Sequence, residues 1–137
     1  MTLQVQLTAQ LVSGPSTVSD NQFPSGVINL TFGLNPPQKP YNVGTSAVVQ
    51  VVSPSSFTPI DAIGSGGQVT QALTLYARAL VPMLLQMTFQ DPNGGPDIVS
   101  VEPINGVKLA EYPSNGFLKA LAVRGSGQFE FWAAGTQ

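Results

Sequence analysis

The sequence has no cysteine and no histidine among its 137 residues. Without cysteine, the chain forms no disulfide framework and offers no thiolate to a metal or a substrate. Without histidine, it lacks the side chain that most often serves as a general base near neutral pH and as a zinc ligand. Only carboxylate chemistry is left, and we expect no catalytic residue, no bound metal and no cofactor.

Charged side chains are also scarce, at 9% of the residues against roughly 25% in an average soluble domain. The net charge is −2, and the few cations are spread along the chain. Binding to a nucleic-acid backbone depends on several neighbouring cations that displace counterions, so we expect no nucleic-acid partner. The cations are Lys39, Arg78, Lys108, Lys119 and Arg124.

So few charges leave the surface to Ser, Thr, Gln, Asn and Gly. Such a surface has little charge repulsion to keep molecules apart. It suits a protein that stays packed in an assembly better than a free monomer.

Long apolar runs are missing too. No run approaches the roughly 18 residues that a membrane-spanning helix needs. The start of the chain, MTLQVQLTAQLVSG, has no basic segment and alternates between apolar and polar residues, unlike a signal peptide. We expect no membrane partner.

The apolar residues that are present fall into short runs, separated by twelve prolines and fourteen glycines. Residues 2–12 alternate with a period of two, and so do residues 27–34, which is the pattern of half-buried strands. Residues 43–53 are rich in β-branched side chains and predict a strand. Residues 83–90 alternate cleanly, with Met83 beginning the apolar series.

Residues 68–80 fit two patterns. Alternation places Val69, Leu73 and Leu75 on one face of a strand, whereas helical spacing gathers Val69, Leu73 and Tyr76. We favour a strand because its neighbours are strands, and we expect Pro82 to end it. Further runs follow in the sequence, and the last two flank Gly125-Ser126-Gly127.

These runs predict an all-β fold of eight to ten short strands. Because no alternation of strands and helices occurs, we expect an antiparallel β-sandwich of the jelly-roll type or a related barrel. The length fits one domain over residues 1–137. Within it, residues 1–12 could form an extended arm or edge strand that pairs with a neighbouring sheet.

The carboxylates show no catalytic arrangement in the sequence. A glycosidase would need two of them facing each other across a cleft, but most lie beside Pro, Asn or Gly, where acids cap turns. We therefore expect turn and surface roles for them. They are Asp20, Asp61, Asp91, Asp97, Glu102, Glu111 and Glu130.

Two glycine-rich segments resemble ligand loops only in part. Residues 91–97, DPNGGPD, carry oxygen ligands of the kind that calcium takes, but they lack the closing Glu and the flanking helices of an EF-hand. A hairpin turn explains the same residues, and a bound cation there remains an open alternative. Residues 64–68, GSGGQ, lack the Lys-Ser/Thr pair of a phosphate loop, and we interpret them as a loop.

The end of the chain predicts a hairpin with two different faces. If Gly125-Ser126-Gly127 is a three-residue loop, Val123 lies opposite Phe129 and Leu121 lies opposite Phe131. The two-residue period then places these four side chains on the core face.

The other face of this hairpin holds the candidate interface residues Trp132, Glu130 and Arg124. In this register Arg124 lies diagonally across from Glu130, within reach of a weak ion pair. A tryptophan outside the core is covered by a loop or arm, covered by another subunit, or exposed to bind something.

Residues 68 to the end resemble small virion structural proteins of tailed bacteriophages, of the capsid decoration or cement type. The resemblance is carried by QALTLYARAL, then MTFQDPNGG, then INGVKLAEYPSNGFLKALAVRGSGQFEFWAAG. It implies a β-sandwich on the outer capsid surface of the virion, bound between major capsid proteins as a dimer or trimer. It implies no catalytic residues, and it covers about half of the chain.

We therefore expect a virion structural protein and not an enzyme, with the major capsid protein and copies of itself as partners. The alternative is a receptor- or carbohydrate-binding module of a phage tail or baseplate. Such a module needs exposed rings on which sugars stack, and Tyr41, Tyr76, Tyr112 and Trp132 are the candidates. A hydrolase working through two carboxylates is the third hypothesis.

Overall fold

The structure is a computed structural model that describes residues 6–12, 27–33 and 43–137. These residues form eight strands and no helix, so the predicted all-β class is confirmed. They accordingly contain no helix that could cross a membrane. The chain separates into two compact units, one of residues 4–38 and one that contains residues 43–137.

The first unit is a two-stranded antiparallel sheet of β1 (Gln6–Val12) and β2 (Val27–Gly33). In its register Leu7 pairs with Phe32 and Leu11 pairs with Ile28. Both strands were predicted from the alternation of the sequence. Whether residues 1–12 act as an arm, and whether residues 1–137 form one domain, stay predictions.

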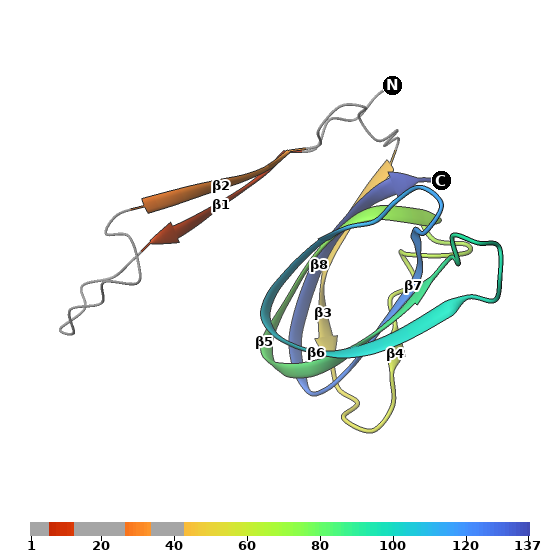
Figure 1. Ribbon diagram of the computed structural model, residues 1–137. Helices are drawn as coiled ribbons and strands as arrows, with labels where there is room; N and C mark the ends of the chain where they lie inside the picture. Colours follow the sequence, from red (N-terminus) through yellow and green to blue (C-terminus); the bar gives the residue numbers. More distant parts are fainter. Residues whose placement is uncertain (1–5, 13–26, 34–42) are drawn as a thin grey trace. The chain divides into compact units, whose positions relative to one another are not determined.

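The second unit is a six-stranded curled sheet in the order β3-β8-β5-β7-β4, with β6 paired to β5. Figure 1 shows β5 and β6 curving together around the interior of this sheet. The strands are β3 (Val43–Val51), β4 (Thr58–Pro59), β5 (Gln71–Phe89), β6 (Ile98–Glu111), β7 (Leu118–Arg124) and β8 (Gly127–Thr136).

The curl is produced by an irregularity in the long β5–β6 pair. Ala79 pairs with Gly106 and the next pair is Met83 with Ile104, so β5 has three unpaired residues where β6 has one. Such an insertion bends a strand and strengthens its twist. The prediction that Pro82 ends the strand is wrong, because Pro82 lies in this unpaired segment and no ladder hydrogen bond needs its missing N–H.

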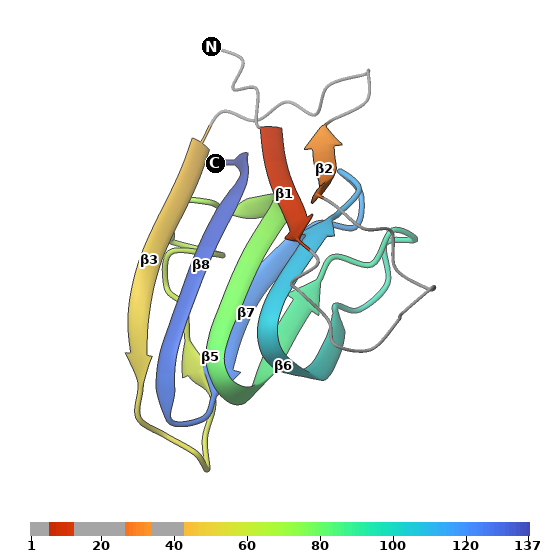
Figure 2. The same cartoon turned by 90° about the vertical axis from the view of Figure 1, so that its left-hand side faces the viewer.

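The bend gives β5 two halves with different neighbours. Residues 71–79 pair with β8, whereas residues 84–89 pair with β7, which meets the first half of β5 only at Ala72. The expected hairpin, with Val123 opposite Phe129, is therefore wrong, since β7 and β8 each pair with β5 instead of with one another. Figure 2 shows β3, β8, β5 and β6 in front, with β7 and β4 behind them.

The connection between β7 and β8 packs tightly against the bend in β5. A Cβ atom on Gly125 would lie 2.6 Å from the side chain of Met83, and one on Gly127 would lie 2.6 Å from that of Val81. These glycines therefore serve close packing at a crossover between the two halves of the sheet, where the sequence predicted a hairpin loop.

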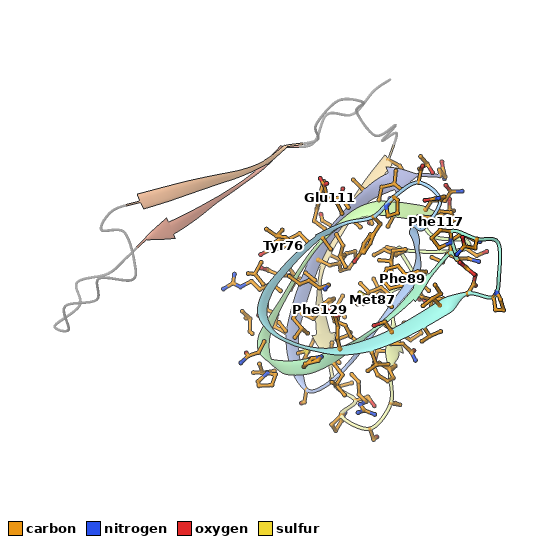
Figure 3. The ribbon with its side chains drawn as sticks, in the orientation of Figure 1. Tyr76, Met87, Phe89, Glu111, Phe117 and Phe129 are labelled. Carbon is orange, nitrogen blue, oxygen red and sulfur yellow. The ribbon has the colours of Figure 1, made fainter. Side chains whose placement is uncertain are left out.

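The core lies inside the curl and takes side chains from both halves. Phe129 and Phe131 of β8 and Leu121 and Val123 of β7 are buried, so the predicted core face of the terminal segment is confirmed. The rings of Phe129 and Phe131 are stacked, with centroids 6.4 Å apart. In Figure 3, Phe129 and Met87 lie inside the curled sheet and Tyr76 lies outside it.

Replacing Phe129 with alanine should lower the free energy of unfolding by about 3–5 kcal/mol, because a fully buried aromatic ring leaves a cavity. Denaturant titration of the whole chain measures this. Val107→Ala is the control, since Val107 is 58% exposed, and a surface truncation changes stability by about 0.5 kcal/mol or less. Similar losses in the two variants would contradict the position of the core.

Candidate interaction surface

The outer face of β8 carries a patch of mixed chemistry, built by the pairing of three strands. Trp132 lies between Ser46 of β3 and Tyr76 of β5 in one row across the sheet. Glu130 lies between Val48 of β3 and Arg78 of β5 in the next row. These six residues are called the outer-face patch below, and most of them line a shallow depression in the surface.

Glu130 organises the polar side chains of the outer-face patch. The hydroxyl of Tyr76 donates a hydrogen bond to Oε1 of Glu130 over 3.1 Å, and Nη1 of Arg78 donates to the same oxygen over 3.2 Å. The one carboxylate and the one guanidinium of the patch therefore form an ion pair with each other. The outer-face patch therefore has no net charge, and its apolar surface comes from the indole of Trp132 and the side chain of Val48.

Burial and the hydrogen bond to Glu130 act together on the phenol of Tyr76. Burial is the larger cause, and both raise the pKa of Tyr76 above its ordinary value. The phenol therefore keeps its proton and remains a donor to Glu130. The Arg78–Glu130 pair is partly exposed, and exposed pairs contribute about 0–1 kcal/mol to stability.

The three predicted interface residues do not lie together. Trp132 and Glu130 share the outer-face patch, but Arg124 belongs to β7, which pairs with the other half of β5. Its guanidinium lies 5.0 Å from the ring centroid of Phe57, in a cation–π contact. The ion-pair partner of Glu130 is Arg78, so the expected Arg124–Glu130 pair is wrong.

Arg78 was not predicted as a site residue, and Tyr76 was predicted only as a candidate sugar-stacking ring and not as a donor to Glu130. Strand alternation alone places both on the face opposite Leu75 and Ala77, and Leu75 and Ala77 are fully buried. The signal was therefore present in the sequence. What was absent was the register that brings β5 beside β8.

A second pair of charged side chains, Glu102 and Lys108, lies on the edge strand β6. Glu102 pairs with Leu85 and Lys108 pairs with Ala77, and both of these β5 positions face the core. Glu102 and Lys108 thus point toward the inner side of the sheet, where they form a salt bridge with each other. Inward-pointing charges on an edge strand oppose pairing with another sheet.

Tyr112 closes the interior beside Glu102. Its ring packs against Phe89, with centroids 5.1 Å apart, and its hydroxyl donates to the sulfur of Met87 over 3.8 Å. Burial raises the pKa of Tyr112 to about 12, and the negative charge of Glu102 adds to this effect. Of the four candidate sugar-stacking rings, Tyr112 is therefore a packing residue, and Tyr41 lies outside the described residues.

The carboxylates of the loop at 91–97 bind groups of the protein itself. Oδ1 of Asp91 accepts the N–H of Asn93 over 2.9 Å, and Oδ2 accepts that of Gly95 over 3.0 Å. Asp97 pairs with Nζ of Lys119 over 2.9 Å. Across residues 6–12, 27–33 and 43–137, no three acidic side chains gather as metal ligands. Asp20, the remaining candidate acid of the first part of the chain, lies outside these residues.

The comparisons with known proteins add no constraint on this surface, because no family model, curated protein or solved structure matches the chain. The function is therefore argued from the chemistry of the surface.

The phenol of Tyr112 should titrate near pH 12, against an ordinary value of 10.0. Because the folded state holds the proton more tightly, the stability that this provides is complete below about pH 10 and is lost as the pH rises towards 12. Titration of phenolate absorbance, with Tyr112→Phe to assign the step, measures the pKa. Glu102→Gln should lower it but leave it above 10.0, since burial is the larger cause. A return to the ordinary value in that variant would contradict this order of causes.

Proposed function

We propose that the chain is a structural protein of a bacteriophage virion, a decoration or cement protein on the outer capsid surface that bridges major capsid proteins. The observation that carries this proposal is the combination of few charges with exposed apolar side chains along the strands. Eight large hydrophobic residues of the described part are at least 37% exposed. They are Val48, Val52, Leu80, Val81, Ile98, Val99, Val101 and Val107.

Exposed apolar side chains of this kind suit binding to another protein better than catalysis of a reaction. Covering apolar surface contributes about 25 cal/mol per Å², so several valines on a sheet face give a modest affinity for a matching surface. A cement protein acts in many copies on one shell, and multivalent attachment turns modest affinities into firm binding. No nucleic acid, membrane, metal or cofactor enters this proposal, and the protein is not an enzyme.

The proposal includes the jelly-roll form of the fold and self-association as a dimer or trimer. The curled sheet supports the jelly roll in one respect, since β7 and β8 supply core side chains from two halves of the sheet. The outer-face patch has no net charge, which supports self-association because copies meet there without net repulsion.

Trp132 is the residue of the proposed interface with the largest ring, and it is half-buried on the outer face. Aromatic residues at the centre of an interface often carry most of its binding energy. Glu130 lies next to Trp132 on β8, and we assign it the role of holding Tyr76 and Arg78 in place. Arg124 belongs to a second contact region on β7.

Particles purified from cultures that produce the chain should carry it in stoichiometric copies on an icosahedral shell, as quantitative mass spectrometry and electron microscopy would measure. Trp132→Ala should reduce the copies per particle about tenfold or more, as expected for an interface anchor. It should lower folded stability less than Phe129→Ala does. Gln128→Ala, an exposed neighbour on β8, is the matched control and should keep full occupancy.

Two results would contradict this proposal at different points. A wild-type chain that occurs only as a free monomer, absent from particles, would reject the virion function. Full occupancy of Trp132→Ala on particles would retain the virion function and reject the role of Trp132.

One observation favours a second candidate, the receptor- or carbohydrate-binding module. Trp132 and Tyr76 are direct cross-strand neighbours on the outer face, with Glu130 beside them. Aromatic rings next to charged and hydroxyl groups suit a sugar, which stacks on the rings and exchanges hydrogen bonds with the polar groups.

Glycan-array screening followed by calorimetry tests this second candidate. A binding module should recognise a defined glycan, and Trp132→Ala should abolish the binding while Tyr112→Phe, whose ring belongs to the interior, retains it. Absence of any bound glycan with the wild-type chain would reject this candidate and leave the virion proposal untouched.

A further inference from the structure

The two long edge strands of the curled sheet differ in how they are protected. Among the described residues, β3 pairs only with β8, and β6 pairs only with β5. A strand with one neighbour presents unpaired backbone N–H and C=O groups along its other edge, and these groups are a template for a further strand. Proteins normally blunt such edges with charges, prolines or bulges.

The β6 edge carries all of these protections. It holds the inward-pointing Glu102 and Lys108, Pro103 between them, and an interruption of the ladder beside Gly106. Gly106 also has a positive φ of 96°, which departs from regular strand geometry. The regular, uncharged part of β6 is therefore limited to the short stretch at residues 98–101.

The β3 edge carries none of them. Its nine residues, VGTSAVVQV, include no charge and no proline, and they pair with β8 in an unbroken register. At its centre Ser46, Ala47 and Val48 are exposed one after another, although successive side chains point to opposite faces. The middle of β3 is thus open on both faces as well as along its edge.

We propose that two copies of the chain pair through β3, antiparallel, about a twofold axis at Ala47. Ala47 is the central residue of Val43–Val51, so this register gives the longest possible ladder. A strand that pairs with its own copy in this way makes an isologous contact, in which each residue contact occurs twice. The two sheets then form one continuous sheet across the axis.

The side chains of β3 suit this register. Ser46 lies opposite Val48 of the partner subunit, and Thr45 lies opposite Val49 of the partner subunit. Thr45 and Val49 are both β-branched, and such side chains pack well across the strands of a sheet. No like charges meet, because β3 has no charged residue. The nearest charges on the outer face, Arg78 and Glu130, already pair with each other. Val48, which is 61% exposed in the single chain, gains a neighbouring strand.

This inference deepens the self-association included in the proposed function, and it rests on that part alone. It names the edge and the register, and neither depends on a capsid. A dimer in solution without any virion would leave this inference standing. A virion protein without β3 pairing would leave the proposed function standing.

Single cysteines test the pairing cleanly, since the chain has no cysteine of its own. Ala47→Cys in the full chain should form a disulfide-linked dimer under mild oxidation, because directly opposed residues in a sheet lie within disulfide reach. Val101→Cys is the matched control, on the other edge strand and 52% exposed. Crosslinking at 47 should be about a hundredfold faster, since pairing raises the effective thiol concentration from micromolar towards millimolar.

The register of the proposed β3–β3 pairing is tested by a second set of cysteine variants. Ser46→Cys and Val48→Cys should each crosslink poorly alone, because each lies diagonal to its own copy, and should crosslink efficiently when the two variants are mixed. Equal rates for Ala47→Cys and Val101→Cys would overturn the proposal. Preferential crosslinking of Ala47→Cys to Thr8→Cys in a mixture would overturn it too, since β1 would then be the strand that occupies this edge.

Discussion

The bend in β5 is the constraint on which the rest of this structure depends. A straight strand of nineteen residues would give one flat sheet with its apolar face in water. The unpaired segment between Ala79 and Met83 turns the β5–β6 pair back on itself, so that one strand supplies two edges. β8 pairs with the first half of β5 and β7 with the second, and both contribute buried side chains to one core. The glycines between β7 and β8 matter because this crossover passes directly over the bend.

The sequence predicted which residues form strands and which side of each strand is apolar. Residues 83–89 and 129–132 alternate in the structure as they do in the sequence, because period-two burial is a local property. It did not predict which strands are neighbours. A Gly-Ser-Gly between two β-like runs is the pattern of a hairpin, and only the distant bulge at Pro82 turns it into a crossover. The face of Glu130 was therefore predictable, whereas its partner Arg78 was not, since that contact joins positions 52 residues apart.

Six of the ten charged side chains in the described residues pair with one another in three salt bridges. Arg78 and Glu130 neutralise each other on the outer face, Glu102 and Lys108 protect the β6 edge, and Asp97 and Lys119 join a loop to β7. The low charge content therefore leaves few charged groups available to a ligand once these pairs have formed. The three salt bridges leave few unpaired charges on the described surface, which fits association with protein surfaces better than the binding of ions.

The contrast between the two edges decides the kind of assembly that this sheet can form. If both edges were open, a heterologous contact of β3 with β6 would repeat without closing and build a fibre. In the dimer that we propose, β3 meets another β3, and this contact closes at two copies. An antiparallel pair of this kind has its twofold axis perpendicular to the sheet, so both outer-face patches point to the same side. The proposed dimer would therefore carry both copies of Trp132 on one side, where a weak contact at each would strengthen the other. In this proposal the protected β6 edge limits growth, and the open β3 edge makes attachment bivalent.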